Sequence, residues 1–96
     1  GDPIPATEAL ELGLINRLVE PGELLGAAEE LASRLARNGP LALEAIKRTA
    51  LETNGLPLAE AFAIEAANAA TVMRSEDARE GPRAFSEKRE PVYKGR

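Results

Sequence analysis

The chain has 96 residues and a net charge of −4, and it contains neither cysteine nor histidine. This composition excludes disulfides, thiolate and imidazole catalysis and nearly all zinc sites, and the acidic charge argues against nucleic-acid binding, which needs a basic face. Hydrophobic residues make up 44% of the chain but aromatic residues only 3%, so one mainly α domain of closely packed helices is expected.

The first part of the chain predicts a short helix followed by an extended segment. Residues 6–12 are good helix formers, and Gly13 follows them as a natural left-handed terminator. Residues 14–19 are predominantly apolar and have no strand to pair with, so we expect a short extended connector or an edge strand rather than a sheet. Pro21 should end this segment.

Three long helices are predicted next, over residues 21–37, 40–54 and 57–74. The apolar positions of the first recur at helical spacing. The second and third each open at a proline, a residue tolerated in the first helical turn, and Gly-Pro or Gly-x-Pro sequences separate the helices. Together with short helices at both ends, this pattern predicts a small bundle of about five helices.

Glu65 is the unusual member of the predicted inward face of the third long helix. A carboxylate among apolar neighbours needs a partner, which Lys47 or Arg48 could supply. A structural ion pair is the favoured interpretation, because nothing nearby in sequence completes a reaction site; a catalytic carboxyl is the alternative. The other inward positions are predicted to be Leu58, Ala61, Phe62, Ala66, Ala69, Val72 and Met73.

The last helix is predicted to begin after Ser75, a good N-cap residue, with acidic residues in its first turn. Pro82 cannot donate a backbone hydrogen bond, so the helix should either kink there or divide into a turn at 76–80 and a helix at 82–89. Residues 91–96 are expected to be irregular.

Two kinds of ligand are conceivable for the charges of this final segment. The acidic residues Glu76, Asp77 and Glu80 lie within one and a half helical turns, but as a hydrolase site they lack a base, and as a cation site they are unspecific. Residues 79–96 carry six basic and three acidic residues, so they could hold a small polyanion such as a nucleotide phosphate. The alternative for both groups is a solvated helix face.

Two passages resemble patterns of the crotonase superfamily, the enoyl-CoA hydratases and isomerases. The opening GDPIPATEALELGLINRLV resembles G-x-x-I-x-A-x-x-A-x-x-x-G-L-V-x-x-V, and SEDAREGPRAFSEKREPVYKG resembles the closing pattern S-E-D-x-x-E-G-x-x-A-F-x-E-K-R-x-P-x-F-x-G. Between them, residues 40–47 are similar to P-x-A-x-x-x-x-K. The resemblance covers essentially all 96 residues.

This resemblance implies that residues 1–96 are the C-terminal helical domain of a crotonase-like fold. The family's catalytic carboxylates and oxyanion-hole donors belong to an N-terminal spiral domain, upstream of the passage that matches Gly1. The chain alone is therefore expected to hold no catalytic residue and no metal, and to be inactive. Acyl-CoA is implied as the substrate of the parent enzyme, with no covalently bound cofactor.

The resemblance also implies oligomerisation and a contact with CoA. In the family the C-terminal helices pack on the catalytic core and on neighbouring subunits in trimers or hexamers, and the last helix covers the CoA nucleotide. Carried over by position, Lys88 should meet a CoA phosphate and Phe85 should flank the adenine or pantetheine. The two residues are three apart and are expected to share a helix face. Pro82 and Ala69 depart from the family pattern.

A second hypothesis is a stand-alone helical protein-interaction module with no CoA role. No stretch approaches the roughly 18 apolar residues of a membrane span, and no segment resembles a signal peptide, so a cytoplasmic location without membrane partners is expected. The sequence leaves open the acyl chain and the choice among hydratase, isomerase, hydrolase and decarboxylase reactions. It also leaves open why the chain begins at Gly1.

Overall fold

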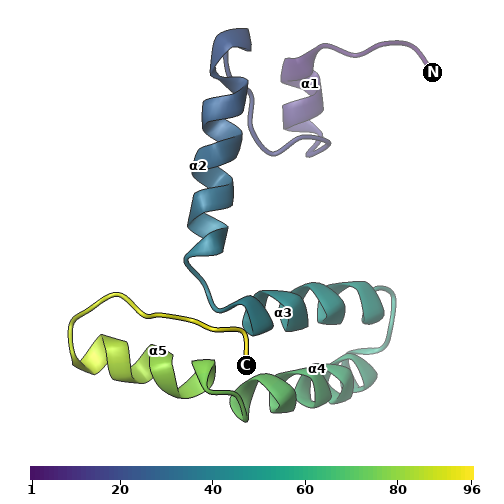
Figure 1. Ribbon diagram of the computed structural model, residues 1–96. Coiled ribbons are helices and arrows are strands. Elements are labelled where there is room, and N and C mark those ends of the chain that lie inside the picture. Colours follow the sequence, from purple (N-terminus) through teal and green to yellow (C-terminus); the bar gives the residue numbers. More distant parts are fainter. The chain divides into compact units, whose positions relative to one another are not determined.

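The computed structural model describes all 96 residues and contains five α-helices and no strand (Figure 1). The mainly α fold and the number of helices predicted from the sequence are confirmed. The chain divides into two compact units, Gly1–Arg34 and Leu35–Arg96. In chain order the elements are α1 (Ala6–Glu11), the 3₁₀ turn η1 (Pro21–Glu23), α2 (Leu24–Ala36), α3 (Pro40–Glu52), α4 (Leu58–Met73) and α5 (Asp77–Ser86).

In the first unit, α1 ends as predicted and the connector folds back on it. Gly13 has a φ of 72°, and the amides of Leu14 and Ile15 both donate to the carbonyl of Ala9, at 2.9 and 3.3 Å. The connector therefore turns at the end of α1 and forms no strand. An ion pair of 2.9 Å between Arg17 and Glu30 joins it to α2.

In the second unit, α3 and α4 form the predicted hairpin and run side by side (Figure 1). Pro40 is the first residue of α3, where a missing amide hydrogen costs nothing. Pro57 instead stands one residue before α4, as its N-cap. The Asn68 side chain links the two helices, donating to the Thr49 hydroxyl and the Glu52 carboxylate at 3.1 Å each.

The predicted inward face of α4 is wrong for its largest side chains. Leu58, Phe62 and Met73 are 70%, 58% and 73% exposed. The half-buried residues of α4 are Ala61, Ile64, Asn68 and Val72. Within this unit α4 packs mainly on α3 and α5, and these contacts leave its largest apolar side chains uncovered.

Glu65 is also exposed, which contradicts the predicted buried ion pair. Neither of the two expected partners, Lys47 and Arg48, forms an ion pair with Glu65, and Arg48 instead binds Glu44 one turn earlier on α3, at 2.5 Å. An i, i+4 pair on one helix needs no tertiary packing, which explains why Arg48 takes the local partner.

No closed hydrophobic core forms within either unit. Ala84 is the only buried hydrophobic residue, and Ser75 and Asp77 are the only buried polar ones. The helices of the second unit pair side by side and leave their outer apolar faces open.

The final helix is continuous through Pro82, so of the two expected alternatives, a kink or a division, the division into two pieces is wrong. The helix ends at Ser86 rather than near residue 89. Its N-terminus is capped as predicted, because the Ser75 hydroxyl accepts the amide of Ala78 at 3.0 Å. Residues 91–96 are irregular, as predicted.

Candidate functional site

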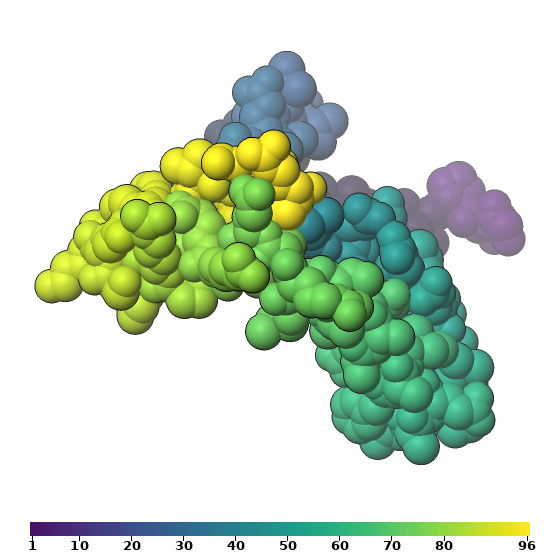
Figure 2. Space-filling model, turned by 60° about the horizontal axis from the view of Figure 1, so that its bottom comes forward, coloured from purple at the N-terminus to yellow at the C-terminus, as the bar shows by residue number.

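The tail that follows α5 is fixed to the start of that helix. The Asp77 carboxylate accepts the amides of Lys94 and Gly95, at 2.7 and 2.8 Å, and the amides of Glu76 and Asp77 donate to the Arg96 carbonyl, at 2.7 and 3.3 Å. In Figure 2 the yellow tail lies against the green start of α5. Asp77 is buried with both oxygens satisfied, so it is a structural anchor for the tail.

Tyr93 extends this anchor to the start of α3. Its ring lies 3.6 Å from the position of a Cβ on Gly39, and its hydroxyl oxygen lies 3.3 Å from the position of a Cβ on Gly81. Gly95, with a φ of 72°, similarly approaches Pro40. Glycine at these positions lets the tail pack closely between α3 and α5.

Glu80 holds the middle of the tail. It binds the Arg89 guanidinium with both oxygens, at 2.5 and 3.1 Å, and accepts the Val92 amide at 2.9 Å. These bonds, first the one from Arg89 and then the one from Val92, lower the pKa of Glu80 to about 2. We call this arrangement of Glu80, Arg89 and Val92 the Glu80 clasp.

Glu87 supports the same guanidinium from the other side. Its carboxylate binds Arg83 at 2.9 Å and Arg89 at 2.6 Å, and these two arginines lower the pKa of Glu87. The two carboxylates together hold Arg89 ionised and raise its pKa, with the Glu80 bond contributing most. The result is a network of four charged side chains at the end of α5.

Lys88 stands at the turn that ends α5, in the left-handed region with a φ of 54°. Its amide donates to the Phe85 carbonyl at 3.2 Å, and the amide of Arg89 donates to the Ala84 carbonyl at 3.1 Å. This pair of bonds is the Schellman motif, which usually has glycine at the position of Lys88. A side chain here carries a backbone cost that glycine would avoid.

Phe85 is 87% exposed although it is aromatic. The predicted shared helix face of Phe85 and Lys88 is wrong, because α5 ends at Ser86 and Lys88 lies beyond its C-cap. The turn nevertheless keeps the two residues adjacent through the bond between their backbones. The exposed ring of Phe85 therefore lies at the end of α5 next to Lys88, whose backbone is held by the turn.

The three acidic residues considered as a hydrolase or cation site have separate partners. Asp77 binds tail amides, Glu80 binds Arg89, and Glu76 faces Arg96 at 3.4 Å. No group of three potential metal-ligating side chains occurs in the chain. These carboxylates therefore hold the tail in its folded position. Sequence spacing could not reveal this role, because their partners lie 9 to 20 residues away.

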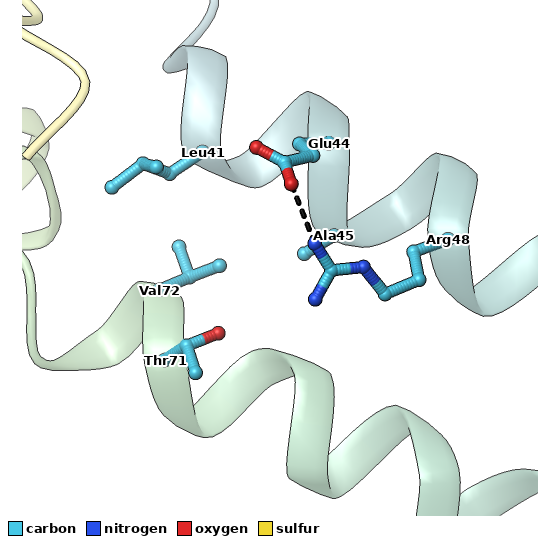
Figure 3. Close-up of a pocket in the computed structure, with 6 residues that line it drawn as sticks. All are labelled: Leu41, Glu44, Ala45, Arg48, Thr71 and Val72. Atoms are coloured by element: carbon cyan, nitrogen blue, oxygen red, sulfur yellow. Dashed lines mark hydrogen bonds and ion pairs between the residues drawn. The ribbon is translucent and has the colours of Figure 1, made fainter.

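An open hollow of about 230 Å³ lies between α3 and α4. Figure 3 shows that the Arg48 guanidinium points back to Glu44 on its own helix, while Thr71 and Val72 face it from α4. The charges of Arg48 and Glu44 are paired, and the Thr71 hydroxyl donates to the Asn68 carbonyl at 2.6 Å. It is lined by Leu41, Glu44, Ala45, Arg48, Thr71 and Val72.

Similar sequences belong to enzymes of CoA thioesters. The enoyl-CoA hydratase EchA19 of Mycobacterium tuberculosis is 48% identical over 96 residues, and the carnitinyl-CoA dehydratase of Salmonella agona is 42% identical over 100 residues. All of this chain is matched in both cases, but only 36% and 38% of the relatives. The chain thus spans well under half the length of these proteins.

Solved structures give the same result. An enoyl-CoA hydratase from M. tuberculosis H37Rv superposes with a TM-score of 0.94 at 45% identity, and EchA1 from Mycobacterium marinum with 0.93 at 43%. Each superposition includes all of this chain and 38% of the chain in the solved structure. None of the five α-helices combines the length and the hydropathy that a membrane span requires. Residues 1–96 also match the family described as enoyl-CoA hydratase/isomerase, and the chain therefore belongs to the enoyl-CoA hydratase/isomerase family.

Proposed function

We propose that residues 1–96 are the C-terminal domain of an acyl-CoA hydratase or isomerase, with two roles: it joins subunits, and it covers bound CoA. The catalytic groups are supplied by the remainder of a longer polypeptide, so this piece alone is inactive. The observation that carries the proposal is the uncovered apolar surface. Seventeen large hydrophobic side chains are exposed, while Ala84 is the only buried hydrophobic residue.

Large exposed apolar surfaces usually mark sites of protein–protein contact. The chain matches only 36% to 40% of the length of its relatives, which supports the remainder of the polypeptide as one occupant of this surface. Further copies of the domain would cover the rest and give the trimers or hexamers expected of the family. The cytoplasmic location stays a prediction.

The CoA contact is proposed for Phe85 and Lys88. An exposed aromatic ring can stack on adenine, and an adjacent ammonium can bind phosphate. The bonded turn between them supports this pairing better than the shared helix face expected from the sequence. The catalytic segment would determine which acyl chain is bound and which reaction is catalysed.

Reconstitution from two pieces tests the proposal. The coding sequence upstream of Gly1 should supply roughly 150 to 170 residues of catalytic spiral, a normal domain size. Co-expressed with residues 1–96, this segment should co-purify in a multimer and hydrate or isomerise an enoyl-CoA, while neither piece does so alone. Absence of association would favour the stand-alone interaction module.

The CoA contact is tested separately in the intact polypeptide. Phe85→Ala or Lys88→Ala should weaken CoA binding, measured by calorimetry, by about fivefold or more, the loss expected for one stacked base or one phosphate contact. Unchanged affinity in both variants would refute the contact and leave the subunit-joining role standing.

A further inference from the structure

We infer that Glu80 is a positioning residue for CoA, acting through Lys88. This inference rests on the proposed CoA contact of Phe85 and Lys88, and it adds the interaction that fixes the conformation of Lys88 for that contact. Glu80 lies about one and a half helical turns before Phe85, and its carboxylate binds the tail.

The turn at Lys88 is strained. Lys88 has the φ of 54° that a glycine would adopt at lower cost, so the isolated helix end would tend to relax. Two backbone bonds close the turn, and Arg89 contributes one of them through its amide. Whatever fixes Arg89 therefore fixes the conformation of Lys88.

Arg89 is in turn held in place by a carboxylate of α5. Glu80 binds its guanidinium with both oxygens, a geometry that sets direction as well as distance. The same carboxylate accepts the Val92 amide at 2.9 Å. The helix thus holds the chain on the far side of Lys88 at two points, and the Glu80 side chain is only 18% exposed.

The negative charge of Glu80 and its positioning role would affect phosphate binding in opposite directions. An acidic side chain near a phosphate site lowers affinity by simple electrostatics, so removing Glu80 should strengthen binding if charge alone matters. Positioning predicts the opposite sign. Glu90 provides the matched control, because it lies two residues from Lys88, carries the same charge and makes no ion pair through its carboxylate.

The test uses CoA as the probe, with calorimetry on the intact polypeptide. Glu80→Ala should weaken CoA binding about fivefold, a modest part of the loss seen when a partner of a hydrogen-bonded charge pair is truncated. Glu90→Ala should bind equally or slightly more tightly. Glu80→Gln, which keeps an acceptor for the Val92 amide and for Arg89, should recover much of the lost affinity.

A double-mutant cycle separates positioning from general damage. In a Lys88→Ala background, Glu80→Ala should have almost no further effect, since the group that it positions is gone. Equal effects of Glu80→Ala in both backgrounds, or an increase in affinity, would overturn the inference. If Lys88→Ala itself changes nothing, the proposed CoA contact of Lys88 fails instead, so the two failures are distinguishable.

Discussion

The hydroxyl oxygen of Tyr93 lies 3.3 Å from the position that a Cβ on Gly81 would occupy. Gly81 is inside α5, where glycine is less favourable than alanine by about 1 kcal/mol. The ring has little room to move away, because it also packs against the backbone at Gly39, whose Cβ position lies 3.6 Å from it, and because the tail is bound to Asp77. Close packing of the tail thus explains a glycine that helix propensity disfavours.

Gly81→Ala should therefore destabilise α5 by about 0.5 to 1 kcal/mol, since the gain in propensity is smaller than the cost of displacing Tyr93. Amide hydrogen exchange of α5 in the intact polypeptide measures the effect. In a Tyr93→Phe background the hydroxyl is absent, and Gly81→Ala should become stabilising. The same sign in both backgrounds would show that the hydroxyl does not restrict this position.

Lys88→Gly should stabilise the end of α5 by about 1 kcal/mol, the usual cost of a left-handed conformation for a residue with a side chain. Exchange protection of the Arg89 amide should rise accordingly. Lys88→Ala is the control, because it removes the ammonium group but keeps the backbone cost. Both variants should lose CoA affinity, so greater stability would accompany weaker binding. If the Arg89 amide were no better protected from exchange in Lys88→Gly than in Lys88→Ala, the left-handed conformation of Lys88 would carry no backbone cost.

Local features were predictable from the sequence and long-range ones were not. Pro40, Gly13 and the Ser75 cap mark helix ends through their own backbone chemistry. The exposed face of α4 could not be foreseen, since an apolar pattern says that a face avoids water but not which partner covers it. The role of Asp77 depends on amides 17 and 18 residues away in an irregular tail.

The candidate site shows the same division. The positions of Phe85 and Lys88 follow from the resemblance to the family, but their relation in space does not. A helix was expected to continue to residue 89, because no glycine signals the end of α5. The left-handed lysine depends on the Glu80 clasp, whose members are 9 and 12 residues apart.

Acid should release the Glu80 clasp only at very low pH. The pKa of Glu80 in the folded protein is about 2, below the ordinary 4.5, because Arg89 and then the Val92 amide bind the ionised form. The folded state thus gains stability from this group above pH 4.5, and loses it as the pH falls through about 2. Carboxyl NMR titration should show this midpoint for Glu80. A midpoint near 4.5 would mean that the clasp is not formed in solution.

Asp77→Asn should free the tail. The two carboxylate oxygens of Asp77 each accept one tail amide, from Lys94 and from Gly95. Asparagine offers one acceptor oxygen, so its amide group must face an N–H donor, and one buried bond is lost at a cost of about 1 to 3 kcal/mol. Exchange protection of the Lys94 and Gly95 amides should fall by roughly tenfold or more.

Glu76→Gln is the matched control for this release, since it removes the same charge from the adjacent residue. Its carboxylate faces Arg96 at 3.4 Å on the surface, where an ion pair contributes little. The Glu76 amide still donates to the Arg96 carbonyl in that variant. Tail protection should therefore persist in Glu76→Gln and fall in Asp77→Asn. Equal protection in the two would mean that the backbone bonds at Arg96 hold the tail without Asp77.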